Sequence, residues 1–307
     1  MSFNADQLAQ ISNTARFSST LGLIGVLGVA VSYYKYPGEF KTPMGRLILA
    51  MSVADLIDAS SKFAGRWTMA SGVASLGCQA QGALIQMGTL SAIFLSFVMA
   101  ATVVMVITAK THFSITRNYE LVAVACCFLI PVPMSVIPLM LKSPDGTPLI
   151  GDSSQWCWIK GGPTFPQQLM FFFVPFWAVF LFNVIALLLV WGKINDLNKN
   201  IRNPHDRKKS FYVVKRMVAY LVAFLFAWTA STVNRMSTFY FGYSLFPFAI
   251  LQALCSPARG FFNFLAFVYC QRTNPANLLS NSSQTGKSRT GISKLGSSVN
   301  IFKSENA

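Results

Sequence analysis

The chain has 307 residues, of which 53% are hydrophobic and only 11% are charged, and its mean hydropathy is +0.48. An ordinary soluble domain has about 25% charged residues, so this composition excludes that class. A net charge of +15 would favour a nucleic-acid partner in a soluble protein, but here the basic residues lie between long uncharged apolar blocks. We therefore expect an integral membrane protein whose partner is the lipid bilayer, with no nucleic acid.

Seven apolar stretches are long enough to cross a bilayer, because a helix needs roughly 20 apolar residues to span a core of about 30 Å. They comprise residues 17–34, 45–65, 78–109, 121–141, 168–191, 213–238 and 243–270. These runs are continuous, whereas the strands of a membrane barrel would show alternating segments of about ten residues. The sequence thus predicts an all-α, seven-transmembrane helix bundle over residues 17–270.

Lysine and arginine residues set the predicted orientation of this bundle. With the N-terminus outside, eighteen of the 25 basic residues fall on cytosolic segments and six near the outer face. Cytosolic loops are enriched in these residues, so 1–16 become a short external N-terminal segment and the C-terminus is cytosolic. Residues 271–307 contain eleven Ser or Thr and few large apolar side chains. They predict a disordered basic tail, either plain or phosphorylated.

Two ionisable residues of opposite charge lie at membrane depth in different spans. Asp55 is ten residues into the second span and Arg259 is eleven residues before the end of the seventh. At about 1.5 Å per residue both are near the midplane. A charge at this depth is costly and is a functional candidate. The two side chains either form an ion pair or bind water and Asn263 separately.

Further polar residues lie toward the outer end of the spans. Asp58 and Lys62 have the i, i+4 spacing of a helical ion pair, which either stabilises the second span or contacts a ligand. Gln81 and Gln86 are pocket candidates on the third span, although a contact with a neighbouring helix explains each equally well. Arg235, late in the sixth span, is expected to snorkel to the outer surface.

Two cysteines lie on the predicted oxidising side of the membrane. Cys78 opens the third span and Cys157 lies in the loop between the fourth and fifth. We expect a disulfide that ties this loop across the mouth of the bundle, with two free thiols as the alternative. Trp156 and Trp158 flank Cys157 and either line a ligand entrance or anchor the loop at the membrane surface. Cys270, at the inner end, is either palmitoylated or buried.

The residue inventory argues against catalysis. Both histidines, His112 and His205, lie in predicted loops, so the sequence offers no metal cluster and no Ser/His/Asp set. A phosphate-cradling glycine loop is absent as well. No lysine occurs between Arg216 and Lys287, which removes the Schiff-base lysine that a retinal photoreceptor needs. We expect no enzyme activity, no metal and no cofactor.

The sequence resembles the cyclic-AMP-receptor-like family of G-protein-coupled receptors and the related fungal nutrient-sensing receptors. The matching motifs are Cys78-Gln79-Ala80-Gln81-Gly82, Gln155-Trp156-Cys157-Trp158-Ile159 and Pro257-Ala258-Arg259-Gly260-Phe261-Phe262-Asn263. The resemblance covers about 17–270 and leaves the tail unmatched. The chain departs from the family pattern at Arg259, where the family usually has Gln.

The resemblance implies a plasma-membrane receptor that carries the signal of a small external ligand to a heterotrimeric G protein through a conformational shift. The residues expected to face the G protein are Lys110, Arg207, Lys208, Lys209, Lys215 and Arg216. Topology and binding to anionic lipid explain these charges equally well. The alternatives are a small seven-helix transporter, suggested by Pro166-Gln167, and a structural membrane protein that uses the fold without signalling.

Overall fold

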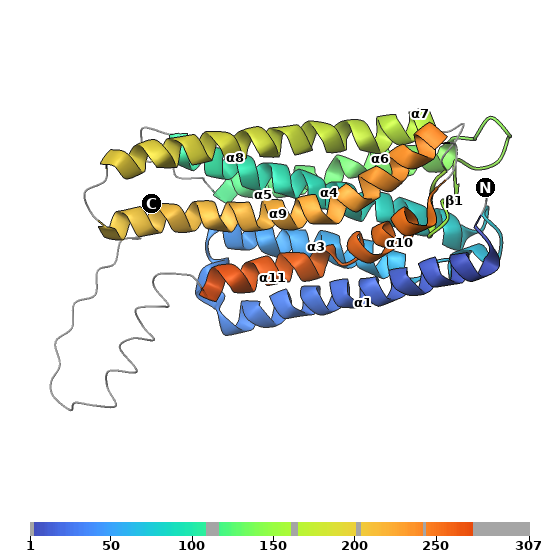
Figure 1. Ribbon diagram of the computed structural model, residues 1–307, viewed down its shortest axis with the longest axis horizontal. Coiled ribbons are helices and arrows are strands. Elements are labelled where there is room, and N and C mark those ends of the chain that lie inside the picture. The colour runs from blue at the N-terminus through green and yellow to red at the C-terminus, as the bar shows by residue number, and fades with distance from the viewer. Residues whose placement is uncertain (1–2, 109–116, 161–164, 201–203, 242–243, 273–307) are drawn as a thin grey trace, which may run out of the picture.

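The computed structural model describes residues 3–108, 117–160, 165–200, 204–241 and 244–272. In this part of the chain, helices lie side by side along the long axis of the molecule and form seven rods (Figure 1). The rods are α1 (Ala5–Lys35), α3 (Pro43–Phe63), α4 (Leu76–Thr108), α5 (Arg117–Leu129) with α6 (Pro131–Met140), α7 (Phe165–Gln168) with η3 (Leu169–Phe173) and α8 (Val174–Asn200), α9 (Pro204–Phe241), and α10 (Phe246–Cys255) with α11 (Arg259–Arg272). The short helices α2 (Pro37–Phe40) and η1 (Trp67–Met69) lie in the connections.

Four stretches of the described helices are apolar and long enough to cross a membrane by length and composition alone. They are Ala5–Lys35, Leu76–Met105, Arg117–Met140 and Pro166–Lys193. Helix α3 has the length of a span, but it carries Arg46, Asp55, Asp58 and Lys62. The seventh rod is divided into two shorter helices near Pro257. Asp55, Asp58 and Lys62, which interrupt the apolar pattern of α3, belong to the site described below.

The first helix is longer than the sequence analysis predicted. Residues 5–16, part of the predicted short external N-terminal segment 1–16, are helical and continue α1 toward the N-terminus. The Asn4 side chain accepts a hydrogen bond from the backbone N–H of Gln7, and the Gln7 side chain accepts one from the backbone N–H of Asn4. This capping box satisfies two N–H groups at the helix start, so the helix begins before its apolar stretch.

Proline and glycine shape the rods locally. The fourth rod is interrupted before Pro131, and η3 is a π-helical turn that ends just before Pro175. Proline has no N–H to donate, so regular hydrogen bonding is disturbed at these points. Glycines let α1 approach the last rod, because a Cβ at Gly25 would overlap the backbone of Gly260. Such close contacts between backbones are typical of helix packing in membranes.

A two-stranded hairpin covers the end of the bundle where the N-terminus lies (Figure 1). It consists of β1 (Ile150–Asp152) and β2 (Cys157–Ile159), which pair antiparallel with Ile150 opposite Ile159. We call this end of the molecule the hairpin end. Beneath it lies an aromatic core that includes Trp156, Trp158, Phe172, Phe176, Phe224 and Trp228.

Candidate functional site

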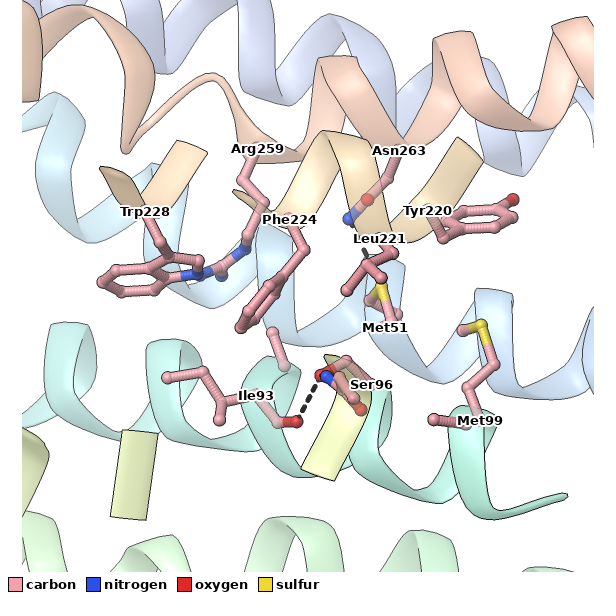
Figure 2. Close-up of a pocket in the computed structure, with 13 residues that line it drawn as sticks. Met51, Ile93, Ser96, Met99, Tyr220, Leu221, Phe224, Trp228, Arg259 and Asn263 are labelled. Carbon is pink, nitrogen blue, oxygen red and sulfur yellow. Dashed lines mark hydrogen bonds between the residues drawn. The ribbon is translucent and has the colours of Figure 1, made fainter. Parts of the chain in front are cut away.

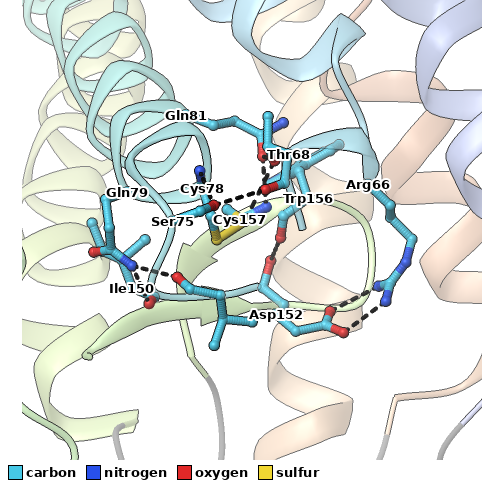
Figure 3. Close-up of a disulfide and its surroundings, with 12 residues drawn as sticks. Arg66, Thr68, Ser75, Cys78, Gln79, Gln81, Ile150, Asp152, Trp156 and Cys157 are labelled. Atoms are coloured by element: carbon cyan, nitrogen blue, oxygen red, sulfur yellow. Dashed lines mark hydrogen bonds and ion pairs between the residues drawn. A yellow bond between two sulfur atoms is a disulfide. The ribbon is translucent and has the colours of Figure 1, made fainter. Parts of the chain in front are cut away.

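A disulfide fixes the hairpin to the bundle. It joins Cys78, in the first turn of α4, to Cys157 of β2, with the two Cα atoms 5.3 Å apart (Figure 3). The structure thus contains the bridge that the sequence analysis expected. The disulfide holds the residues next to Cys157 over the ends of the helices.

Gln81, one turn further along α4, uses both ends of its amide to hold the hairpin. Its oxygen accepts from the backbone N–H of Cys157 at 3.0 Å and from the hydroxyl of Thr68. Its nitrogen donates to the carbonyl oxygens of Ser61 and Gly65, both at 2.9 Å. The side chain therefore connects α4, the hairpin and the end of α3, and protein atoms fill its hydrogen-bonding positions.

Ion pairs secure the exposed side of the hairpin. Arg66 donates to both carboxylate oxygens of Asp152 at 2.8 Å, a bidentate pair that Figure 3 shows. In the preceding turn, the Asp145 carboxylate lies 3.8 Å from Nζ of Lys160. Hydrogen bonds from the side chain and backbone of Thr147 lower the pKa of Asp145. These contacts order the hairpin without extending into the bundle.

Trp156 and Trp158 point into the protein, with only 2% and 6% of their surfaces exposed. Neither is a membrane-surface anchor, which was one of the two interpretations of the sequence. Trp158 Nε1 donates to Gln86 Oε1 at 2.7 Å, and Gln86 Nε2 donates to the carbonyl of Phe171 in η3 at 2.8 Å. The Lys62 ammonium lies 5.1 Å from the centre of the Trp156 ring. The two tryptophans thus cover the space between the helices at the hairpin end.

A buried ion pair joins α3 to α11 in the middle of the bundle. Arg259 Nε donates to Asp55 Oδ1 at 2.6 Å, and Asn263 Nδ2 donates to Asp55 Oδ2 at 2.8 Å. Both interpretations of the sequence are therefore partly realised, because Asp55 binds Arg259 and Asn263 at once. Asn263 is one helical turn after Arg259, so a single face of α11 supplies both donors.

Asp58 extends this network toward the hairpin end. One of its oxygens accepts from Lys62 Nζ at 2.9 Å and lies 3.4 Å from Nη2 of Arg259. The other accepts from the Thr89 hydroxyl at 2.8 Å. Lys62 also donates to the Ser256 hydroxyl at 2.8 Å. The network consequently links α3, α4, α11 and the turn at Ser256 that follows α10, entirely within the buried interior.

Two cavities adjoin this network. The central cavity has a volume of about 40 Å³ and lies among α3, α4, α8, α9 and α11, with Met51, Ser96, Tyr220, Trp228, Arg259 and Asn263 in its wall (Figure 2). The hairpin cavity has a volume of about 20 Å³ and is lined by Lys62, Ile85, Thr89, Trp156, Trp158, Phe172, Phe173, Trp228, Ser231, Arg235, Gln252 and Ser256. Trp228 belongs to both walls, so one indole ring separates the two spaces.

The predicted pocket residues divide into two groups. Lys62, Trp156 and Trp158 line the hairpin cavity. Asp58, Gln81 and Gln86 lie behind that wall. Asp58 and Gln86 bond the lining residues Lys62 and Trp158, and Gln81 bonds Cys157 between the two tryptophans.

Arg235 corrects the sequence analysis, which placed it at the outer surface. It is 7% exposed, lines the hairpin cavity, and its guanidinium carbon lies 5.1 Å from the centre of the Trp158 ring. The hairpin covers the end of the bundle and removes the path to water that snorkelling requires.

Several residues of the site were missed in the sequence. Thr89, Ser231 and Ser256 are short hydroxyl side chains within apolar runs, and such residues also bind their own helix backbone. Arg46 and Glu120 form a bidentate pair with N–O distances of 2.6 and 2.5 Å at the end opposite the hairpin. The sequence could have predicted this pair, because Arg46 and Glu120 carry opposite charges near the ends of two predicted spans.

The residues expected to face a G protein are mostly beyond what the structure shows. Lys110 lies outside the described residues. Arg207, Lys208, Lys209, Lys215 and Arg216 lie along the beginning of α9, and their side chains are outside the described part. Cys270 is buried, as one of its two interpretations required. Among the described residues, no group of three or more His, Cys, Asp or Glu side chains could hold a metal ion.

Comparison with known proteins identifies related sequences. The family model described as slime mold cyclic AMP receptor matches residues 3–281. Cyclic AMP receptor-like protein A of Dictyostelium discoideum is 24% identical over 272 residues, covering 86% of this chain and 66% of that protein. Cyclic AMP receptor-like protein B of the same organism is 30% identical over 125 residues, covering 40% of this chain and 27% of that protein. The chain thus spans less than two thirds of the length of these relatives.

Among solved structures, the crystal structure of squid rhodopsin has the same fold. The TM-score is 0.68 at 13% sequence identity, and the match covers 97% of this chain and 90% of that one. This likeness confirms the predicted all-α, seven-transmembrane bundle, including the rods whose polar residues weaken their apolar pattern. Together with the four apolar helices and the family match, the fold makes the chain an integral, multi-pass membrane protein.

Proposed function

Because this chain belongs to the slime mold cyclic AMP receptor family, we propose that it is a receptor that passes an external chemical signal to a heterotrimeric G protein. The observation that carries the proposal is the hairpin cavity, which lies under a disulfide-bound cover and reaches the buried ion network. Concave sites with aromatic walls and a few convergent polar groups are typical of small-ligand binding.

The arrangement supplies a route from the cavity to the helices. A ligand in the hairpin cavity would contact Trp228, whose other face borders the central cavity. The Arg259 guanidinium carbon lies 5.9 Å from the centre of the Trp228 ring, so displacing that ring disturbs the ion network as well. A ligand that binds better to one arrangement of α9 and α11 would shift the population toward it.

The proposed orientation places the hairpin end outside the cell at the plasma membrane. A disulfide such as Cys78–Cys157 persists in an oxidising environment, which supports an external position for the hairpin. The opposite ends of α8 and α9 would then receive the G protein, with Arg207, Lys208 and Lys209 along the beginning of α9. Lys110, outside the described residues, is a further candidate. The basic excess on that side agrees with the charge distribution of cytosolic loops.

The test is agonist-dependent nucleotide exchange on a purified G protein, with the full chain in lipid nanodiscs. Cyclic nucleotides, sugars and amino acids are the probes, and we expect one class to raise the exchange rate. Trp228→Ala should abolish this response, whereas Trp67→Ala, at an exposed position outside both cavities, should keep it. Solute flux through liposomes without any probe-dependent exchange would favour a transporter instead.

A second experiment tests the side that receives the G protein. Charge reversal at Arg207, Lys208 and Lys209 should lower probe-dependent exchange. The matched control reverses three tail charges, at Lys287, Arg289 and Lys294, and should leave exchange unchanged. Equal exchange by both triple variants would contradict a docking role for the beginning of α9.

A further inference from the structure

A groove opens on the outer surface of the bundle between α9 and α11, on the side of the Asp55–Arg259 pair that is away from the hairpin. It has a volume of about 610 Å³, and α8 contributes Trp191 to its wall. Ligand sites in proteins occupy roughly 300–1,000 Å³, so the groove has the size of a binding site. Its described wall residues are apolar or aromatic, and none of them is charged.

Small side chains on the two helices make this groove. Ala219 and Ala223 lie one turn apart on α9, and Ala266 lies on α11. The larger wall residues Val222 and Leu265 stand out from the surface, with 58% and 46% of their surfaces exposed. An apolar chain laid between them would therefore contact α9 and α11 at the same time.

The groove has the height of one leaflet of a bilayer. Near the middle of the membrane, Phe226 and Phe262 meet edge to face across α9 and α11, with ring centres 5.1 Å apart. Phe262 follows Arg259 by three residues, and α11 continues for ten more residues to Arg272. Ten residues advance a helix by about 15 Å, which is half of a hydrocarbon core of about 30 Å.

The far end of the groove carries interfacial and basic residues. Trp191 and Tyr269 are 50% and 49% exposed, and such amphipathic rings are typical of the headgroup level. Arg272 is exposed and follows Tyr269 by three residues, which places it on the same side of α11. In the sequence of α9, Lys215 comes one turn before Ala219. Positive charge at this depth favours an anionic lipid.

We propose that the groove binds an anionic phospholipid, with one acyl chain between α9 and α11 and the headgroup beside Arg272. Because the groove opens toward the bilayer, a lipid chain reaches it without leaving the membrane. Only the assignment of this lipid to the cytosolic leaflet rests on the proposed function, since it follows from the proposed orientation. Binding itself requires no G protein.

The experiment measures the tryptophan fluorescence of the purified full chain in detergent micelles. The probes are phosphatidylserine and phosphatidylcholine whose acyl chains carry bromine near the glycerol, because bromine quenches a tryptophan that it contacts. The signal is the part of the quenching that is lost in Trp191→Phe. We expect this part to saturate, and to do so at a lower concentration of phosphatidylserine than of phosphatidylcholine.

Matched variants separate the acyl chain from the headgroup. Ala223→Leu fills the groove and should weaken both lipids roughly tenfold, whereas Ala178→Leu, at an exposed position of α8, should bind like the unaltered chain. Arg272→Gln should weaken phosphatidylserine roughly fivefold and leave phosphatidylcholine unchanged. Lys193→Gln is its control, because Lys193 is exposed and lies two residues after Trp191, on a different side of α8.

Several results would overturn the inference. They are quenching that rises linearly without saturation, equal affinity for the two lipids, and equal binding by Ala223→Leu and Ala178→Leu. Saturable quenching that appears only in the double variant Ile301→Asp and Phe302→Asp would assign the groove to the chain's own tail. Quenching that falls as the protein is concentrated would assign it to a second copy.

The outcomes also separate this inference from the proposed function. Saturable phosphatidylserine binding in a chain that never drives nucleotide exchange would contradict the receptor alone. Probe-dependent exchange in a chain without saturable lipid binding would support the receptor and contradict the lipid site.

Discussion

Arg259 donates from Nε to Asp55 Oδ1 across 2.6 Å and thereby joins α11 to α3 in the interior of the bundle. The two side chains are only 4% and 2% exposed. Bringing both charges out of water is costly, and their attraction offsets that cost only while both partners remain. The pair therefore makes the position of α11 relative to α3 sensitive to any change at either residue.

Replacing one partner of this pair should lower the free energy of unfolding by more than the intact pair contributes to it. We expect Asp55→Asn and Arg259→Gln each to lower the free energy of unfolding by about 3–5 kcal/mol, since each leaves a buried charge uncompensated. The double variant should lose much less than the sum of the two, because the pair is then removed together. Unfolding of the purified chain by detergent titration measures all three values.

The exposed pair of Arg66 and Asp152 provides the matched control. Its side chains are 24% and 44% exposed, so the same double-variant cycle should give a coupling of about 1 kcal/mol or less. Additive losses at Asp55 and Arg259 would show that the two charges do not depend on each other. In that case the network would have to be explained by Asn263 and the neighbouring groups of Asp58.

Gln81 should be needed for stability rather than for ligand contact. In Gln81→Leu, the N–H of Cys157 and the carbonyl oxygens of Ser61 and Gly65 lose their partner. Each unsatisfied buried group costs about 1–3 kcal/mol, so we expect a loss of at least about 2 kcal/mol in the free energy of unfolding.

Gln79→Leu is the comparison for this change, because Gln79 is less buried and its amide donates to the carbonyls of Val73 and Ile150. It should cost clearly less than Gln81→Leu in the same unfolding measurement. Equal stabilities of the two variants would show that the amide of Gln81 is dispensable and return this residue to the set of ligand candidates.

Removing the disulfide should loosen the cover of the hairpin cavity. The double change Cys78→Ser and Cys157→Ser should lower the free energy of unfolding by about 2–5 kcal/mol. Dithiothreitol should shift Tm of the unaltered chain toward that of the double variant and leave the double variant unchanged. Cys126→Ser, at an exposed free cysteine, is the control and should respond to dithiothreitol like the unaltered chain. A reductant-insensitive Tm of the unaltered chain would contradict a stabilising bridge.

The features that depend only on depth along a span could be predicted from the sequence. Asp55 and Arg259 lie at equal depth because each residue advances a helix by about 1.5 Å, and this holds for any rotation of the helices. The start of α1 was also within reach, since Asn4 and Gln7 have the spacing of a capping box.

Features that depend on how the helices are rotated were not predictable in this way. Arg235 was placed at the surface, although a loop was expected across the mouth of the bundle, because the sequence does not show toward which side of α9 this residue points. Thr89 and Ser256 could each have faced lipid or their own backbone. Phe172 and Phe173 lie within the π-helical turn η3, which departs from the α-helical period, so their inward direction could not be predicted from that period.

The contact between α3 and α4 beside Asp58 should depend on the absence of a side chain at Gly88. A Cβ there would lie 2.8 Å from the backbone nitrogen of Asp58 and 2.9 Å from the carbonyl oxygen of Ala54. Gly88→Ala should therefore push the helices apart, weaken the hydrogen bond from Thr89 to Asp58, and cost about 1–3 kcal/mol in unfolding free energy. Gly192→Ala on α8 meets nothing within 4 Å and should instead be neutral or stabilise by about 0.5–1 kcal/mol through helix propensity. A stable Gly88→Ala variant would mean that the two backbones can separate without loss, and that the position of Asp58 is set by Lys62 and Arg259 alone.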